Sequence, residues 1–341
     1  MDIAPKERPH SVLQVSDLQK SDIEKILKLA SMRQAPQVFA GRGAALIFEH
    51  PSARTRNAAE MAVFQLGGHP ISIAGAEIGI DRRESAEDIA RVLARYHCLI
   101  GARVASHETL VRMNKAISET GTTVPVVNLL SNRDHVTQAL ADLMTIKQKF
   151  DNISAIKVAY IGDPNNVCYS LAQMASIMGF SLQIAAPEKY LEKTDFLCLG
   201  SGTGSEQGAF WVGSTASREK NFDQNAATEN NIMAFTDPYR AVKNADVLYT
   251  DVFVSMGEEK LAEEKRRDYK AYVINKDLLE HAAGHAVVMH CLPAHRGEEI
   301  TAEVLEGPKS IVFDQAENRM HAMRGLFAYL LGASSDTDAE S

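Results

Sequence analysis

The chain has 341 residues, which is too long for one small core and favours two domains of ordinary size. Its composition, 45% hydrophobic and 23% charged, is that of a soluble globular protein. The net charge of -8 gives no support to a nucleic-acid partner. No apolar run approaches the roughly 20 residues of a membrane span, and "MDIAPKERPHSVLQ" lacks the apolar segment of a secretory signal. We therefore expect a cytoplasmic protein with no membrane partner.

Short apolar runs alternate with amphipathic segments in both halves of the chain. In the first half we expect strands at 44–49, 69–75, 98–105 and 124–130, and helices at 13–32, 52–68, 85–97, 107–118 and 136–150. In the second half we expect strands at 157–163, 181–187, 245–253, 286–293 and 310–317, and helices at 165–180 and 319–332. This alternation predicts an α/β protein with two parallel-sheet domains that are linked by long helices.

The domain boundary is predicted near Phe150. The first domain would be 1–150, with the last helix 319–332 packing back onto it, and the second would be 151–318. Residues 190–232 are rich in Gly, Ser, Thr and Asn and indicate a long loop or insertion, while the tail 333–341 is expected to be disordered.

The stretch "FEHPSARTRN" predicts an anion site at the start of a helix. Ser52 can cap the helix, and the first-turn N–H groups then point outward beside Arg54 and Arg56. A helix N-terminus flanked by guanidinium groups provides a dipole, backbone donors and planar forks for a phosphate. The alternative is that the two arginines only pair with nearby carboxylates.

Two further segments carry polar side chains that could bind a carbonyl group. His135 and Gln138 lie three residues apart at the start of a helix, so both can face one site. Arg103 and His107 follow an expected strand. Each of these residues could instead be an ordinary surface residue.

The segment "TDVFVSMGEE" predicts a site for an amino-acid zwitterion. Asp251 ends an expected strand and could bind an ammonium group, while the turn Ser255–Gly257 offers backbone groups. The alternative is that Asp251 only caps the next helix.

Cys291 lies at the carboxyl end of another expected strand, where open α/β sheets bind ligands. It could be a nucleophile, a proton acceptor or a packing residue. Four histidines, His281, His285, His290 and His295, show no metal spacing with Asp or Cys, so no metal site is expected. The segment "GSGTGSEQG" lacks the third glycine of a dinucleotide fingerprint, which disfavours a Rossmann dehydrogenase.

Taken in this order, the motifs resemble those of the aspartate/ornithine carbamoyltransferase family, and within it the ornithine branch. The segments "SARTR", "RVASH", "HVTQALADL", "DVFVSMG" and "HCLPAHRGEE" carry the resemblance, which covers about Val15 to Leu331. The resemblance implies transfer of a carbamoyl group from carbamoyl phosphate to the side-chain amine of L-ornithine, giving citrulline and phosphate. It implies no metal or other cofactor, a homotrimer or a multiple of trimers, and an active site in the cleft between the domains.

The resemblance also implies roles for particular residues. The residues implied to bind carbamoyl phosphate are Ser52, Ala53, Arg54, Thr55, Arg103, His135, Gln138, Cys291, Leu292 and Arg319. Those implied to bind ornithine are Asn166, Asp251, Ser255 and Met256, and the catalytic group comprises Arg54, Arg103, His135, Gln138, Asp251, Cys291 and Arg319.

The chain departs from the family pattern at three places. Ala53 stands where the ornithine branch usually has Thr, which keeps a backbone contact and removes a hydroxyl; Val136 replaces the usual Pro; and the insertion near 190–232 is long. Two alternatives stay open, namely a carbamoyltransferase for another amine, such as putrescine or a modified ornithine, and a catalytically silent relative.

Overall fold

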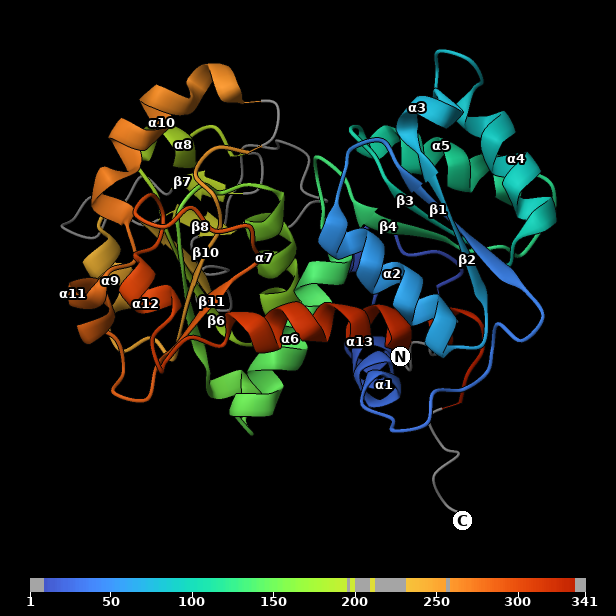
Figure 1. Cartoon of the computed structure of the whole chain (residues 1–341). Coiled ribbons are helices and arrows are strands. Elements are labelled where there is room, and N and C mark those ends of the chain that lie inside the picture. Colours follow the sequence, from blue (N-terminus) through green and yellow to red (C-terminus); the bar gives the residue numbers. More distant parts are fainter. Residues whose placement is uncertain (1–8, 195–196, 200–208, 212–230, 256–257, 335–341) are drawn as a thin grey trace, which may run out of the picture. The chain divides into compact units, whose positions relative to one another are not determined.

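The computed structural model describes residues 9–194, 197–199, 209–211, 231–255 and 258–334. Among these, the residues up to Met144 and from Glu317 onward form one compact unit, and Thr145–Ala316 form the other (Figure 1). Each unit contains a largely parallel sheet with helices packed against it, so the predicted α/β architecture is confirmed.

The first unit is built on a parallel sheet in the order β2-β1-β3-β4. Its strands are β1 (Gly43–Phe48), β2 (His69–Ala74), β3 (Leu99–Arg103) and β4 (Val126–Leu130). Its helices are α1 (Lys20–Ala30), α2 (Ala53–Gln65), α3 (Gly75–Ile78), α4 (Ala86–Tyr96), α5 (His107–Ser118) and the first part of α6 (Val136–Lys149), with a 3-10 turn at Val15–Asp17.

Helices α4 and α5 lie side by side on this sheet (Figure 1). Ile89 of α4 and Met113 of α5 pack with Ile47 of β1 and Ile100 of β3 in one buried apolar cluster. Burial of a side chain of this size contributes about 1.5–3 kcal/mol, so this face of the sheet is a substantial part of the core.

The second unit is built on a sheet in the order β11-β10-β5-β6-β9-β8-β7. Its strands are β5 (Lys157–Ile161), β6 (Ser181–Ala185), β7 (Leu197–Leu199), β8 (Ala209–Trp211), β9 (Ile232–Phe235), β10 (Val247–Thr250) and β11 (Val287–His290). Its helices are α7 (Asn166–Met178), α8 (Glu188–Leu191), α9 (Pro238–Val242), α10 (Ala262–Asp268), α11 (Lys276–Glu280) and α12 (Ala302–Leu305), with 3-10 turns at Ile153–Ala155, Glu259–Leu261 and Tyr269–Tyr272.

The predicted strand at 310–317 is wrong. Only Ser310 bridges the sheet, through Val288, and the chain enters helix α13 (Val312–Leu330) directly afterwards. The predicted last helix therefore begins well before Arg319. The short run "SIVF" does not by itself distinguish a strand from a helix. The buried positions recur at helical spacing, namely at Ile311, Gln315, Asn318 and Arg319.

The predicted loop at 190–232 is also partly wrong. It contains β7 and β8, which pair antiparallel with each other, and β8 extends the sheet next to β9. Three-residue strands are below the length at which a sequence pattern is visible, because edge pairing rather than local preference defines them. The rest of this stretch and the predicted disordered tail lie largely outside the described residues.

The carboxyl-terminal part of α13 packs within the first unit. Arg324, which is buried, donates through Nη2 to the carbonyl oxygens of Ala30 (2.5 Å) and Met32 (3.0 Å) at the end of α1. The Tyr329 hydroxyl donates to Asp22 Oδ1 (2.6 Å). The two bonds from Arg324 satisfy carbonyl groups that a helix end leaves without an intrahelical partner. None of the described helices is long and apolar enough to cross a membrane.

Candidate active site

The first unit has a topological switch point at the carboxyl ends of β1 and β3. The chain passes from β1 through α2 to β2 on one side of β1, whereas β3 pairs with its other side. In open parallel sheets the crevice outside such a point is where ligands bind. Helix α2 begins directly after β1, and Arg103 ends β3, so both lie at this edge.

The opening turn of α2 has the form of an anion site. Ser52 occupies the N-cap position with an extended backbone, but its side chain makes no capping hydrogen bond. The first-turn amides are therefore not occupied by the Ser52 hydroxyl. Arg54 is exposed beside them, whereas Arg56 donates to Glu60 Oε1 (2.8 Å). The alternative that the arginines only pair with nearby carboxylates therefore holds for Arg56.

Thr55 and Arg319 come together from opposite ends of the chain. Arg319 donates through Nη2 to Thr55 Oγ1 (2.7 Å), and their exposed fractions are 4% and 1%. Arg319 was expected at the start of the last helix, but it lies within α13. From there its guanidinium points toward the start of α2. This contact adds a buried cation to the predicted phosphate site.

Arg103 adds a second buried cation, at 7% exposure. Burial lowers the pKa of its guanidinium, and the positive charge of Arg54 lowers it further. A guanidinium group whose pKa is lowered by a neighbouring positive charge favours a nearby anion, because the anion offsets the repulsion. The arrangement therefore suits a ligand with negative charge.

His135 lies fully buried at the amino end of α6. Burial, followed by the charges of Arg319 and Arg103, lowers its pKa well below the usual 6.5. At neutral pH the imidazole is neutral and can donate one N–H to a ligand oxygen. Gln138, three residues on, donates through Nε2 to Asp142 Oδ1 (2.8 Å).

The depressed pKa of His135 gives a pH dependence of stability. In the unfolded chain His135 binds a proton near pH 6.5, whereas in the folded chain it stays neutral at that pH. The free energy of unfolding therefore falls as the pH drops below that value. His135→Gln removes this term, so its stability relative to the wild type is expected to rise toward acid, by up to about 1.4 kcal/mol per pH unit. Urea unfolding at pH 7.5, 6.5 and 5.5 tests this, and a constant difference between the two proteins would contradict it.

The second unit has its own switch point between β5 and β10. The chain runs from β5 through α7 to β6 on one side, and β10 pairs with the other side. Asp251 follows β10 and is 7% exposed. Its carboxylate accepts hydrogen bonds from Cys291 Sγ (2.8 Å) and from Asn165 Nδ2 (2.8 Å). Three segments that are far apart in sequence thus converge on one carboxylate.

The other predicted residues of this unit are close in sequence to Asp251 or to one of its two hydrogen-bond partners. Asn166 is the first residue of α7, which follows β5, and Ser255 lies four residues after Asp251, half-buried. Leu292 follows Cys291 with a left-handed φ of 56° and a cis bond to Pro293. Met256 lies outside the described residues.

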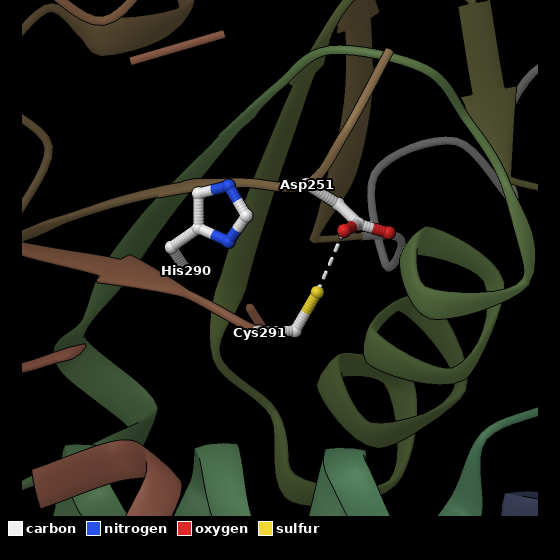
Figure 2. Close-up of side chains that lie close together, drawn as sticks. All are labelled: Asp251, His290 and Cys291. Carbon is white, nitrogen blue, oxygen red and sulfur yellow. Dashed lines mark hydrogen bonds between the residues drawn. The ribbon is translucent and has the colours of Figure 1, made fainter. Parts of the chain in front are cut away.

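The sequence shows no metal spacing, but the fold brings together three side chains of types that can bind metals. Figure 2 shows Cys291 pointing at Asp251 with His290 close by, and the potential ligand atoms of these three lie within 4.8 Å of one another. Sequence spacing missed this cluster because Asp251 comes from β10 and the other two residues follow β11. Both ring nitrogens of His290 already have protein partners, Glu299 Oε1 and the Leu292 N–H, so the cluster is not arranged as a ligand set.

Sequence reasoning missed three supporting groups. Asn165 caps α7 through Oδ1 and holds Asp251 through Nδ2. Asn128 is fully buried in β4 and donates to the carbonyl oxygen of Asp134 (3.1 Å), which fixes the backbone before His135. Lys265 is buried and pairs with Asp163 (3.0 Å) and Glu258 (2.6 Å). A polar residue inside an apolar strand was the one available signal, for Asn128.

Comparison with known proteins places these two groups of residues in a family. The model described as aspartate/ornithine carbamoyltransferase, carbamoyl-P binding domain, matches residues 10–148. The model for the Asp/Orn binding domain of the same family matches residues 154–330. The chain therefore belongs to the aspartate/ornithine carbamoyltransferase family.

Individual relatives are similar over most of their length. The ornithine carbamoyltransferase of Hyperthermus butylicus is 44% identical over 292 residues, which are 85% of each chain. That of Pyrococcus horikoshii is 40% identical and covers 94% of this chain and 95% of its own. The solved structure of the Pyrococcus furiosus ornithine carbamoyltransferase has a TM-score of 0.80 at 37% identity and covers 96% of this chain and 98% of its own.

Proposed function

We propose that this protein is an ornithine carbamoyltransferase, which moves the carbamoyl group of carbamoyl phosphate to the side-chain amine of L-ornithine and releases citrulline and phosphate. The observation that carries the proposal is the group of cationic and polar side chains at the carboxyl edge of the first sheet. Arg54, Arg103, Arg319 and neutral His135 form a site for a phosphate with an adjoining carbonyl group. The close relatives of the ornithine branch support the choice of the second substrate.

The first group of residues would bind and polarise carbamoyl phosphate. The first-turn amides at Ser52 and Ala53, with Arg54 and Arg319, hold the phosphate. Ala53 can contribute only its backbone N–H, because it lacks the hydroxyl of the Thr that is usual at this position in the family. The helix dipole and the guanidinium groups would therefore provide the remaining interactions with the phosphate. Thr55, Arg103 and His135 face the carbonyl oxygen, and stabilise the charge that develops there as the amine attacks.

The second group of residues would bind ornithine and complete the transfer. Asn166, Asp251, Ser255 and Met256 fix its amino-acid end. Gln138 and the backbone carbonyls of Cys291 and Leu292 orient the carbamoyl nitrogen. The uncharged side-chain amine forms the new C–N bond, the C–O bond to phosphate breaks, and the amine proton leaves with the help of Asp251 and Cys291. Much of the rate enhancement would come from positioning.

A substrate panel tests the assignment. Purified protein with carbamoyl phosphate is expected to turn over ornithine, and to turn over putrescine, N-acetylornithine and lysine at least about 100-fold less well, because a polar pocket that is left unmatched by a missing or blocked group discriminates strongly. The readout is ureido product by mass spectrometry together with released phosphate. Turnover of putrescine without turnover of ornithine would replace the proposal with the alternative amine.

Three further assignments belong to the same proposal. The unit containing β1–β4 would be the carbamoyl-phosphate-binding domain and the unit containing β5–β11 the ornithine-binding domain. A homotrimer is supported by exposed apolar side chains on α2 and β2, namely Met61 (42%), Phe64 (65%) and Ile71 (43%). A cytoplasmic location is supported by the thiols of Cys98, Cys168 and Cys291, which are free.

A further inference from the structure

A buried pair of side chains supports the turn that follows β11. His290, the last residue of β11, and Glu299, nine residues on, both have fully buried side chains. His290 Nε2 lies 2.9 Å from Glu299 Oε1. The same carboxylate oxygen accepts the backbone N–H of His295 (2.5 Å). Glu299 therefore anchors the segment 291–298 at the residue that precedes it, His290, and near its middle, at His295.

The backbone contact of His290 fixes its tautomer. The backbone N–H of Leu292 points at His290 Nδ1 at 2.9 Å. A backbone amide can only donate, so Nδ1 must be the unprotonated acceptor, and the ring proton lies on Nε2, where it is donated to Glu299. A carboxylate that orients an imidazole in this way determines what the other ring nitrogen can do.

Leu292 is held in a conformation that a leucine rarely adopts. Its φ of 56° lies in the left-handed region, which a bulky side chain occupies only where the surroundings enforce it. The hydrogen bond to His290 Nδ1 holds the Leu292 amide in a fixed direction at this residue. The His290 backbone N–H is itself fixed by Gln315 Oε1 (2.8 Å).

We infer that His290, oriented by Glu299, is a positioning residue that sets the backbone of Leu292 for the carbamoyl group. This inference rests on the proposed function, in which the carbonyls of Cys291 and Leu292 orient the carbamoyl nitrogen. If the Leu292 peptide rotated, its carbonyl would no longer point at the carbamoyl nitrogen. Such a misplacement of a group that orients the reacting substrate affects turnover far more than the binding of an amino acid at Asp251.

Two matched substitutions separate the two contacts of the ring. In His290→Asn the side-chain oxygen stands near the place of Nδ1, so the bond from Leu292 is kept and the bond to Glu299 is lost. In His290→Gln the terminal nitrogen stands near the place of Nε2, so the opposite holds. We expect His290→Gln to lower kcat about 100-fold with the KM for ornithine changed less than about threefold, and His290→Asn to retain kcat within about tenfold of the wild type.

The outcomes are distinguishable from a failure of the proposed function. Wild-type protein that makes no citrulline would remove the function and the inference with it. Active wild type together with equal losses in the two variants, or with full kcat in His290→Gln, would overturn the inference alone. Nitrogen-15 NMR of the His290 ring provides a readout independent of activity: a proton on Nδ1 at neutral pH would overturn the inference, and a proton on Nε2 supports it. Thermal melting of both variants reports any general loss of folding.

Discussion

An Arg54→Ala variant is expected to bind carbamoyl phosphate about 100- to 1000-fold more weakly than the wild type. Arg54 is exposed at the first turn of α2, and its charge already lowers the pKa of Arg103. A guanidinium bound to phosphate makes charge-assisted hydrogen bonds of about 1.5–3 kcal/mol each. Loss of two such bonds corresponds to two or more powers of ten in affinity.

The matched control for this variant is Arg56→Ala. Arg56 has the same side chain two positions along the same helix, but it donates to Glu60 at 2.8 Å, and its side chain is 55% exposed. An exposed pair of this kind contributes about 0–1 kcal/mol to stability, and its loss is expected to leave carbamoyl-phosphate affinity within about twofold. The measurement is the KM for carbamoyl phosphate at saturating ornithine, together with competition by inorganic phosphate. Equal losses in the two variants would mean that general positive charge, and not a site at Arg54, attracts the ligand.

The Arg54→Ala substitution is expected to weaken ligand binding with little effect on the stability of the fold. Within the part of the chain that the structure describes, Arg54 makes no ion pair or hydrogen bond, and removal of one of two neighbouring cations relieves repulsion at Arg103. We therefore expect urea unfolding to change by less than about 0.5 kcal/mol, as for most surface substitutions. A large loss of stability would show that Arg54 holds the fold, and the binding result would then need the variant's folded fraction as a correction.

Local pattern predicted most elements because strand and helix periods differ. The alternation of apolar runs with amphipathic segments indicates parallel α/β units, and α7 ends as expected at Gly179, whose φ is 83°. The prediction for 310–317 is wrong because three consecutive apolar residues, Ile311 to Phe313, fit a strand and a buried helix equally well. Only the spacing of the following buried residues, Gln315 to Arg319, distinguishes the two, and polar residues at those positions conceal it.

The candidate site shows a different limit. Sequence motifs identify Thr55 and Arg319 separately, but their 2.7 Å hydrogen bond joins residues at opposite ends of the chain. Asn165 and Glu299 act by holding other polar groups, at Asp251 and His290, and no local spacing reveals such a partner. The roles of side chains that would touch a ligand follow from residue type and place on a strand end, whereas the roles of supporting residues follow only from three-dimensional contacts.

An Asp251→Asn variant is expected to raise the KM for ornithine about 10- to 100-fold and to leave the KM for carbamoyl phosphate nearly unchanged. The carboxylate accepts from Cys291 through Oδ1 and from Asn165 through Oδ2. An amide in its place removes the negative charge that attracts an ammonium group and sets its NH₂ against the NH₂ of Asn165. A hydrogen bond to a charged group contributes about 1.5–3 kcal/mol, which corresponds to this range.

The control on the same strand is Asp246→Asn. Asp246 precedes β10 as Asp251 follows it, and its carboxylate accepts from the Lys157 N–H (2.8 Å) and contacts His285 (2.7 Å) at the opposite edge of the sheet. The change in charge and size is the same, but the amino edge of a parallel sheet is not where its ligands bind. The KM for ornithine is therefore expected to stay within about twofold, and an equal rise in both variants would indicate an effect through strand β10.

Competition by L-norvaline separates the two roles proposed for Asp251. Norvaline has the amino-acid end of ornithine without the side-chain amine, so a carboxylate that binds the α-ammonium group should hold both molecules. If Asp251 acts there, Asp251→Asn weakens norvaline inhibition and ornithine binding by the same factor. If it instead helps the side-chain amine lose its proton, norvaline inhibition is unchanged and kcat falls. Higher pH then partly restores kcat, because more of the amine is already neutral. Unchanged norvaline inhibition with unchanged kcat would exclude both roles and leave Asp251 as the partner that orients Cys291.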